Sequence, residues 1–165
     1  MIARNPDGTY ISGCSLCGHT LADPIYATSH FIADRSHDLW RFSDTAMHWK
    51  CYVRWPEQAR FASMFFDEAM KRSETHPWPI YWSALLKSAD VLVLYGFAVN
   101  EVSVVLRKSG TDMRVPRKMW QHWLSGGWRE DCRPGLEYDA VAELIPHLAE
   151  LTLPEQPPPA SDAAF

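Results

Sequence analysis

The sequence predicts an α+β protein in which a small metal-binding module packs on a small antiparallel sheet with helices. Three observations lead to this prediction. Paired cysteine and histidine residues lie in the first third of the chain, apolar β-branched runs lie between 90 and 115, and segments with helical spacing lie on either side of those runs. A chain of 165 residues with 47% apolar content can bury a core of its own.

The first elements are expected to be short strands followed by two helices. Strand-like composition marks residues 9–13, 24–32 and 39–42. Ser43 or Asp44 suits the N-cap of a helix that begins near Thr45 and contains the sequence HWKC. Pro56 suits the first position of a second helix, which is expected to end near Ser73.

The second half is expected to form a three-stranded meander and two helices. The strands are predicted in DVLVLYGFAV, EVSVVLRK and DMRV, with SGTD as the turn before the last of them. Pro116 starts a helix that ends at Gly126 and Gly127, and residues 136–151 form another helix, interrupted or kinked at Pro146.

Prolines mark the expected boundaries between the parts of the chain. The stretch ETHPWPIYW separates a metal module with its following helix, residues 1–75, from an α+β part, residues 76–153. Residues 154–165 hold four prolines among twelve residues, so they are predicted to be a disordered tail.

One constellation in the sequence has the spacing of a metal site. CSLC supplies Cys14 and Cys17, and HWKC supplies His48 and Cys51. Two residues with two others between them commonly provide adjacent corners of a zinc tetrahedron, and four such ligands leave no open position for catalysis. The sequence therefore predicts one structural Zn²⁺ per chain. Two free pairs with His48 in a core, or a redox pair, are the alternatives.

This ligand pattern resembles a treble-clef zinc finger, with a ligand order similar to that of the first site of LIM domains. The resemblance covers about residues 10–55, and no second CxxC follows Cys51. It implies a knuckle that carries the two cysteines, an intervening hairpin, and a helix that supplies the last pair. Treble clefs serve protein binding, nucleic-acid binding and, in some families, nuclease chemistry.

Charge and hydropathy narrow the range of partners. A formal net charge of −4 disfavours nonspecific nucleic-acid binding. One basic segment lies between 101 and 118 and contains Arg107, Lys108, Arg114, Arg117 and Lys118. The sequence shows no secretion signal and no membrane-spanning run, so a cytoplasmic location is expected. Reduced thiols in that compartment favour a metal site over disulfides.

Aromatic residues are abundant, with eight tryptophans, six tyrosines and seven phenylalanines. They suit either a core that joins two parts or an interface with a protein partner. The candidate partner-binding residues are Trp78, Trp82, Trp120, Trp123, Arg107 and Arg114.

These observations favour a noncatalytic, zinc-stabilised protein-binding module. Its most concrete form is a bacterial immunity or antitoxin-type inhibitor of a partner enzyme. A nucleic-acid-binding zinc-finger protein that uses the basic segment is the first alternative. A treble-clef nuclease that uses His30, His37 or Asp34 beside the finger is the second. The sequence shows no phosphate-binding glycine loop and no nucleophile elbow.

Overall fold

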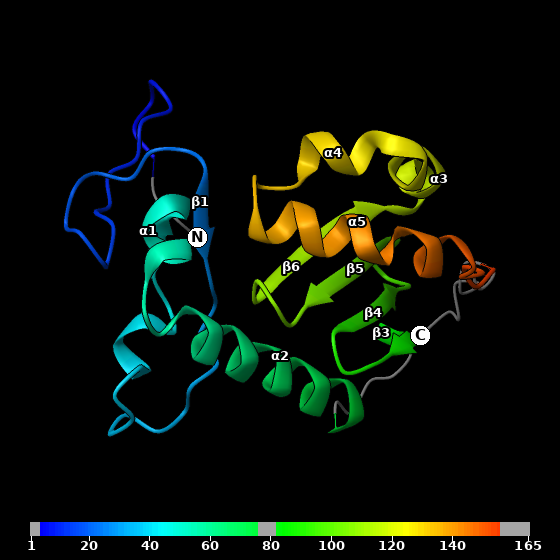
Figure 1. Ribbon diagram of the computed structural model, residues 1–165, viewed down its shortest axis with the longest axis horizontal. Coiled ribbons are helices and arrows are strands. Elements are labelled where there is room, and N and C mark those ends of the chain that lie inside the picture. The colour runs from blue at the N-terminus through cyan, green and yellow to red at the C-terminus, as the bar shows by residue number, and fades with distance from the viewer. Residues whose placement is uncertain (1–3, 76–81, 156–165) are drawn as a thin grey trace, which may run out of the picture. The chain divides into compact units, whose positions relative to one another are not determined.

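The computed structural model describes residues 4–75 and 82–155, and it has the predicted α+β composition (Figure 1). The chain divides into two compact units, residues 1–65 and 66–165. This division lies inside helix α2 (Gln58–Thr75), whereas the sequence-based boundary lies at the end of that helix. Each unit has its own antiparallel sheet, of two strands in the first and four in the second.

The first unit is built from a strand pair and short helices. Strand β1 (Ile25–Ala27) pairs with β2 (Ala46–His48) in antiparallel register, with Tyr26 opposite Met47. Between them lies a 3-10 turn, η1 (Trp40–Phe42), and helix α1 (Trp49–Arg54) follows β2 directly.

Aromatic side chains fill the interior of the first unit. Tyr26 stacks on Tyr52 with ring centroids 3.7 Å apart, and both rings are almost completely buried. Phe61 lies edge-on to Tyr26 and to Phe31 and has no exposed surface. Burial of rings of this size compensates for the shortness of the strands, because each ring removes a large apolar area from water.

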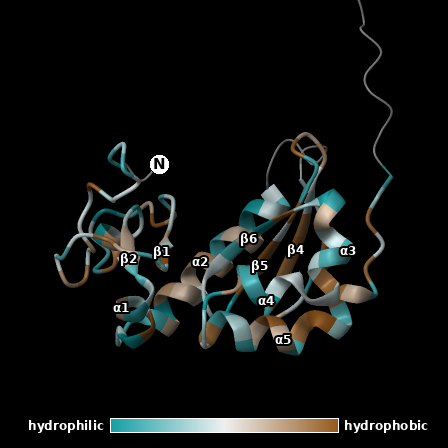
Figure 2. Cartoon of the chain, turned by 90° about the horizontal axis from the view of Figure 1, so that it is seen from above, coloured by the Kyte–Doolittle hydropathy of each residue, from teal (hydrophilic) through white to brown (hydrophobic). Residues whose placement is uncertain are grey.

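The second unit contains a regular meander. Its strand order is β3 (Trp82–Lys87), β4 (Val91–Gly96), β5 (Glu101–Leu106) and β6 (Thr111–Pro116), and all neighbours are antiparallel. The pairing of β3 with β4 is shifted by a bulge near Leu86, whereas β5 and β6 pair without interruption over six residues. Hydrophobic residues gather along β4 (Figure 2).

Helical segments cover one face of this sheet (Figure 1). In order they are η2 (Arg117–Met119), α3 (Trp120–His122), the wide turn η3 (Trp123–Gly127), α4 (Trp128–Asp131) and α5 (Leu136–Ala149). Alternate strand residues such as Val93 and Val104 pack with Trp120 and Val141 in one core. Gly126, at φ 149°, breaks the helical path inside η3, which turns the chain from α3 into α4.

The structure corrects several sequence-based elements. The strand predicted at 39–42 is replaced by the 3-10 turn Trp40–Phe42. The helix expected from Thr45 begins only at Trp49, because residues 46–48 pair with β1. The predicted strands at 9–13 and 24–32 reduce to isolated bridges and to β1. Strand β3 extends the predicted three-stranded meander to four strands.

The start of the expected disordered tail is held in place. The guanidinium of Arg117 donates a hydrogen bond to the carbonyl oxygen of Pro154, and Leu151 and Leu153 pack against the core of the second unit. Residues 156–165, the rest of that predicted tail, lie outside the described residues. Within the described ranges, no helix combines the length and the apolar character needed to cross a membrane.

Candidate metal centre

The four predicted ligands come together in the first unit. The ligand atoms of Cys14, Cys17, His48 and Cys51 all lie within 4.8 Å of one another. The Nδ1 atom of His48 is 3.4 Å from the Sγ of Cys17 and 3.8 Å from the Sγ of Cys51. In a tetrahedral site with metal–ligand distances near 2.0–2.3 Å, neighbouring ligand atoms lie roughly 3.5–3.8 Å apart. The spacing therefore suits four ligands around one ion.

A tight turn presents the first two cysteines. The N–H of Cys14 donates to the carbonyl of His19 and the N–H of Gly18 to the carbonyl of Cys14, each at 2.8 Å. Gly18 has φ 76°, a conformation that costs a glycine little. A bridge between Gly13 and Thr20 closes the turn, so that Cys14 is buried while Cys17 stays exposed.

The other two ligands lie at the junction of β2 and α1. His48 ends the strand and caps the helix, and Cys51 lies three residues further, in the first turn of α1. The ring Nε2 of His48 is 3.0 Å from the carbonyl oxygen of Thr20, which can only accept, so Nε2 carries the proton. The unprotonated Nδ1 then faces the sulfurs, which is how a partner beyond the ligands orients a metal-binding histidine.

Backbone donors shape the electrostatics of the cluster. Burial opposes ionisation of the Cys14 thiol, but N–H donors, foremost that of His48 at 3.4 Å from Sγ, lower its pKa to about 6. For Cys51, burial and then the neighbouring sulfurs of Cys17 and Cys14 raise the pKa to about 11. Three sulfurs so close together repel as thiolates, and a bound cation removes that repulsion.

The arrangement can hold a metal ion with a complete ligand shell. Within the described part of the chain, these four residues form the one group of His, Cys, Asp and Glu side chains close enough to share an ion. All four cysteines, including Cys132 of the second unit, are free thiols. The sequence-based choice of ligands thus agrees with the geometry of a possible Cys₃His site.

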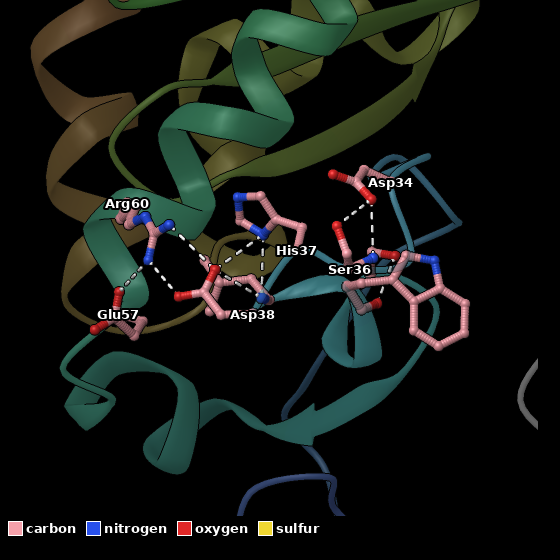
Figure 3. Close-up of polar contacts among 9 residues, drawn as sticks. Asp34, Ser36, His37, Asp38, Glu57 and Arg60 are labelled. Carbon is pink, nitrogen blue, oxygen red and sulfur yellow. Dashed lines mark hydrogen bonds and ion pairs between the residues drawn. The ribbon is translucent and has the colours of Figure 1, made fainter.

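The loop between the strands contains the other acid–base candidates, and they bond locally (Figure 3). Asp34 accepts hydrogen bonds from the N–H and the hydroxyl of Ser36, at 2.8 and 2.7 Å. These bonds, led by the one from the hydroxyl, lower the pKa of Asp34. The Nδ1 of His37 is 3.1 Å from the N–H of Leu39 and 3.0 Å from Asp38. All of these contacts lie within the loop itself.

Arg60 joins this loop to the start of α2 (Figure 3). Its guanidinium contacts both carboxylate oxygens of Asp38, at 2.8 and 3.1 Å, and also Glu57 at 3.3 Å. The bond from Arg60 lowers the pKa of Asp38. The third candidate, His30, lies 3.2 Å from the hydroxyl of Ser43, which donates to the carbonyl of Trp40.

The candidate partner-binding tryptophans have different surroundings. Trp120 and Trp123 stack at 5.4 Å in the core of the second unit and are 1% and 2% exposed, so their surface packs inside that unit. Trp82 is half-buried and covers Gly96, where a Cβ would lie 2.9 Å from its ring. Trp78 lies outside the described residues.

The two candidate arginines are already paired with carboxylates. Arg107 contacts Asp67 at 2.7 Å and lies over the ring of Phe66 at 4.3 Å, which ties α2 to the end of β5. Arg114 contacts Asp112 at 2.9 Å and lies 4.7 Å above the ring of Trp82. Their charges are therefore partly neutralised, which weakens the basic segment as an attractor for phosphates.

Sequence reasoning missed two features of the molecule. The carbonyl of Thr20 orients His48, and a backbone atom carries no signal in the residue types. A groove of about 560 Å³ lies between β6 and the segment from η2 to α4, and its wall includes Met119, Glu130 and Asp131. The adjacent acids Glu130 and Asp131 were the only sign of this groove in the sequence, and only folding brings them opposite the edge of β6.

Comparisons with models of known protein families, with curated proteins and with solved structures find no match to this chain.

Proposed function

We propose that this chain is a noncatalytic protein-binding module whose first unit is held together by one structural zinc ion. The observation that carries the proposal is the convergence of three cysteine sulfurs and the Nδ1 of His48 within 4.8 Å. Soft sulfur ligands together with imidazole, in a tetrahedral arrangement, select Zn²⁺ over harder cations. A shell of four protein ligands leaves no position for a reacting water.

The order of the elements around the ligands supports a treble-clef-like fold for the site. A turn closed by the Gly13–Thr20 bridge provides two ligands, the β1–β2 pair follows, and α1 provides the last ligand. Because the ligands come from two separate pieces of a short unit, metal binding would supply much of the free energy that orders them. We therefore assign the ion a folding role.

The protein-binding role is supported by the surroundings of the residues that the other candidate functions would use. His30, His37 and Asp34 are engaged in the loop, and Arg107 and Arg114 are paired with acids. An inhibitor of a partner enzyme, of the immunity or antitoxin type and acting in the cytoplasm, needs only a stable surface. That is the most concrete form of the proposal.

Metal content tests the zinc assignment. We expect the purified chain to contain one zinc ion and Cys51→Ser to lose it, with a lower midpoint of thermal unfolding, because one ligand of four is gone. Cys132→Ser is the matched control, since it makes the same substitution outside the cluster and should keep the ion. Metal analysis and calorimetry measure both effects. An unchanged zinc content in Cys51→Ser would contradict the assignment.

The binding role is tested by capture from the native host. The tagged chain should retain one stoichiometric protein after nuclease treatment, identified by mass spectrometry. Salt-dependent binding to DNA or RNA that weakens on replacement of Arg107 or Arg114 would favour the nucleic-acid alternative. Cleavage of either polymer that depends on a divalent metal and on His37 would favour a nuclease. Either result, without a protein partner, would overturn the proposal.

A further inference from the structure

Strand β6 forms a regular edge of the four-stranded sheet, and no further strand pairs with it among the residues that the structure describes. It is the last strand in the order β3-β4-β5-β6, and six consecutive residues pair with β5 without a bulge. The opposite edge, β3, has a bulge near Leu86, a device that protects edge strands from further pairing. The two edges of the sheet are therefore not equivalent.

The hydrogen-bond alternation shows which backbone groups point outward from β6. The N–H of Arg117 donates to the carbonyl of Asn100 at 2.9 Å, in the same register as the β5–β6 pairing. Because bonded and non-bonded pairs alternate along an antiparallel ladder, Met113 and Val115 bond to β5. The N–H and C=O groups of Asp112 and Arg114 then point away from β5, toward the groove.

The groove follows this edge along its length. All residues from Asp112 to Pro116 line it on one side, and the other side is formed by residues of η2, α3, η3 and α4. Its volume of about 560 Å³ is in the range that accommodates several side chains. A strand edge facing a helical wall is the geometry in which an extended peptide adds to a sheet.

The wall of the groove carries uncompensated negative charge. Arg114 and Arg133 line it, but each is paired with a carboxylate, Asp112 and Glu137 respectively. Glu130 and Asp131 are exposed on α4 and take part in no ion pair among the residues that the structure describes. The groove therefore favours an occupant with a cationic side chain.

One exposed apolar side chain completes the surface. Met119 is 41% exposed and lines the groove, which the buried Trp123 also lines. Every second side chain of an added strand would face this wall, where apolar groups meet Met119 and a lysine or arginine meets Glu130 or Asp131. Pro116 has no N–H, so the pairing edge is short.

We propose that this groove binds an extended segment of a protein partner, which adds as a fifth strand beside β6 and places a lysine or arginine against Glu130 and Asp131. The inference rests on the proposed protein-binding function and names the surface and the chemistry of the partner. A second copy of the chain is disfavoured as the occupant, because symmetric pairing through β6 would bring the acidic walls of both copies to one interface.

The first test is a selection of short random peptides displayed on phage against the full, zinc-loaded chain. Enriched peptides should have an apolar or β-branched residue at every second position and should contain a lysine or arginine. A fluorescent synthetic copy of the best peptide should bind the wild type, as measured by anisotropy. Failure to enrich any peptide over the bare support, or enrichment of peptides without a basic residue, would overturn the inference.

A substitution that changes the backbone distinguishes hydrogen bonding to the edge of β6 from contact with the Arg114 side chain. Arg114→Pro removes a backbone N–H that points away from β5, and it leaves the hydrogen bonds between β5 and β6 in place. It should lower the affinity for the peptide by about tenfold or more. Arg114→Ala keeps the N–H and is the matched control, expected to stay within about threefold of the wild type because it leaves the edge intact. Equal binding by Arg114→Pro, with its fold verified by circular dichroism, would contradict strand addition.

Charge variants give a second, independent test if Arg114→Pro does not fold. Replacement of Glu130 and Asp131 by lysine, on the exposed surface of α4, should abolish binding of the basic peptide. Glu143→Lys, an exposed acid of α5 outside the groove, should not change it. Binding unaffected by the lysine variants would overturn the assignment of the cation.

Two further outcomes distinguish this inference from the proposed function. A host partner that Arg114→Pro and the lysine variants all retain would leave the protein-binding function standing and reject the groove as its surface. A dimer of the chain that Arg114→Pro dissociates would make a second copy the occupant and overturn the inference. If the wild-type chain binds neither a selected peptide nor a host partner, both proposals are rejected.

Discussion

Cys132 is a buried thiol that takes no part in the Cys₃His cluster. It is 8% exposed and lies 3.8 Å from the sulfur of Met113. Burial, followed by the nearby charges of Glu137 and Asp131, raises its pKa from 9.0 to about 12. The raised pKa favours the protonated thiol in the folded chain and thereby lowers its reactivity, because the thiolate is the nucleophilic form.

We expect a thiol-specific disulfide reagent to distinguish this cysteine from the other three. At mildly alkaline pH, the zinc-loaded chain should react slowly, a chelator should release three thiols, and Cys132 should react only after denaturation. The measurement is absorbance of the released product, with Cys132→Ser as the control that lacks the last step. Rapid reaction of Cys132 in the native chain would contradict its burial.

The same shift sets a direction for stability at high pH. A pKa raised on folding means that the unfolded chain loses this proton first, so the contribution of Cys132 is complete below pH 9. That contribution decreases as the pH rises toward about 12. Cys132→Ser should therefore reduce the loss of stability in this alkaline range, as followed by thermal unfolding at successive pH values.

Helix α5 is anchored at its start by a buried ion pair. Glu137 has no exposed surface and accepts hydrogen bonds from Arg133 through its backbone N–H at 2.6 Å and its guanidinium at 3.0 and 2.9 Å. The carboxylate lies in the first turn of the helix, where the helix dipole favours negative charge. The pair thereby fixes the chain between α4 and α5.

We expect Glu137→Ala to lower the free energy of unfolding by about 3–5 kcal/mol, because it leaves the Arg133 charge without its buried partner. Glu137→Gln should cost less, since its amide oxygen can still accept from the N–H of Arg133. Glu143→Ala on the exposed side of the same helix should change stability by about 0.5 kcal/mol or less. Denaturant unfolding measures all three; an equal effect at 137 and 143 would argue against the anchor.

Elements defined by local signals were predictable, and those defined by distant pairing were not. Helix α2 and strands β4–β6 have clear periodicity or β-branched runs, and they formed near the predicted residues. The N-cap signal at Ser43 failed because pairing of Ala46–His48 with β1 delays the helix to Trp49. Strand β3, WSALLK, lacks β-branched residues and forms by pairing with β4.

The ligand set was predictable for a different reason. A tetrahedral ion restricts ligand spacing so strongly that two short motifs identify the four residues of the possible metal site. Tryptophan has no such constraint, since a ring serves a core and an interface equally well. The sequence therefore could not separate Trp120, in the core, from the half-buried Trp82.

The two units are expected to respond separately to metal removal. The core around Val104 and Trp120 draws on the second unit alone, whereas the first unit combines its aromatic interior with the Cys₃His cluster. A chelator should abolish amide protection in β1, β2 and α1 and preserve it in β4 and β5, because metal binding and folding are coupled. Hydrogen exchange with mass spectrometry measures this, and added zinc should restore protection. Simultaneous loss in both units would contradict separate cores.

The unequal burial of the four sulfur and nitrogen ligands sets the expected kinetics of ion exchange. Cys14 and His48 are 2% and 8% exposed, whereas Cys17 lies open to solvent. A competing thiolate or an oxidant therefore reaches Cys17 first, while the buried ligands still hold the ion. An ion at this site would therefore exchange through one corner of its ligand shell, and its release would begin by ligand substitution at Cys17.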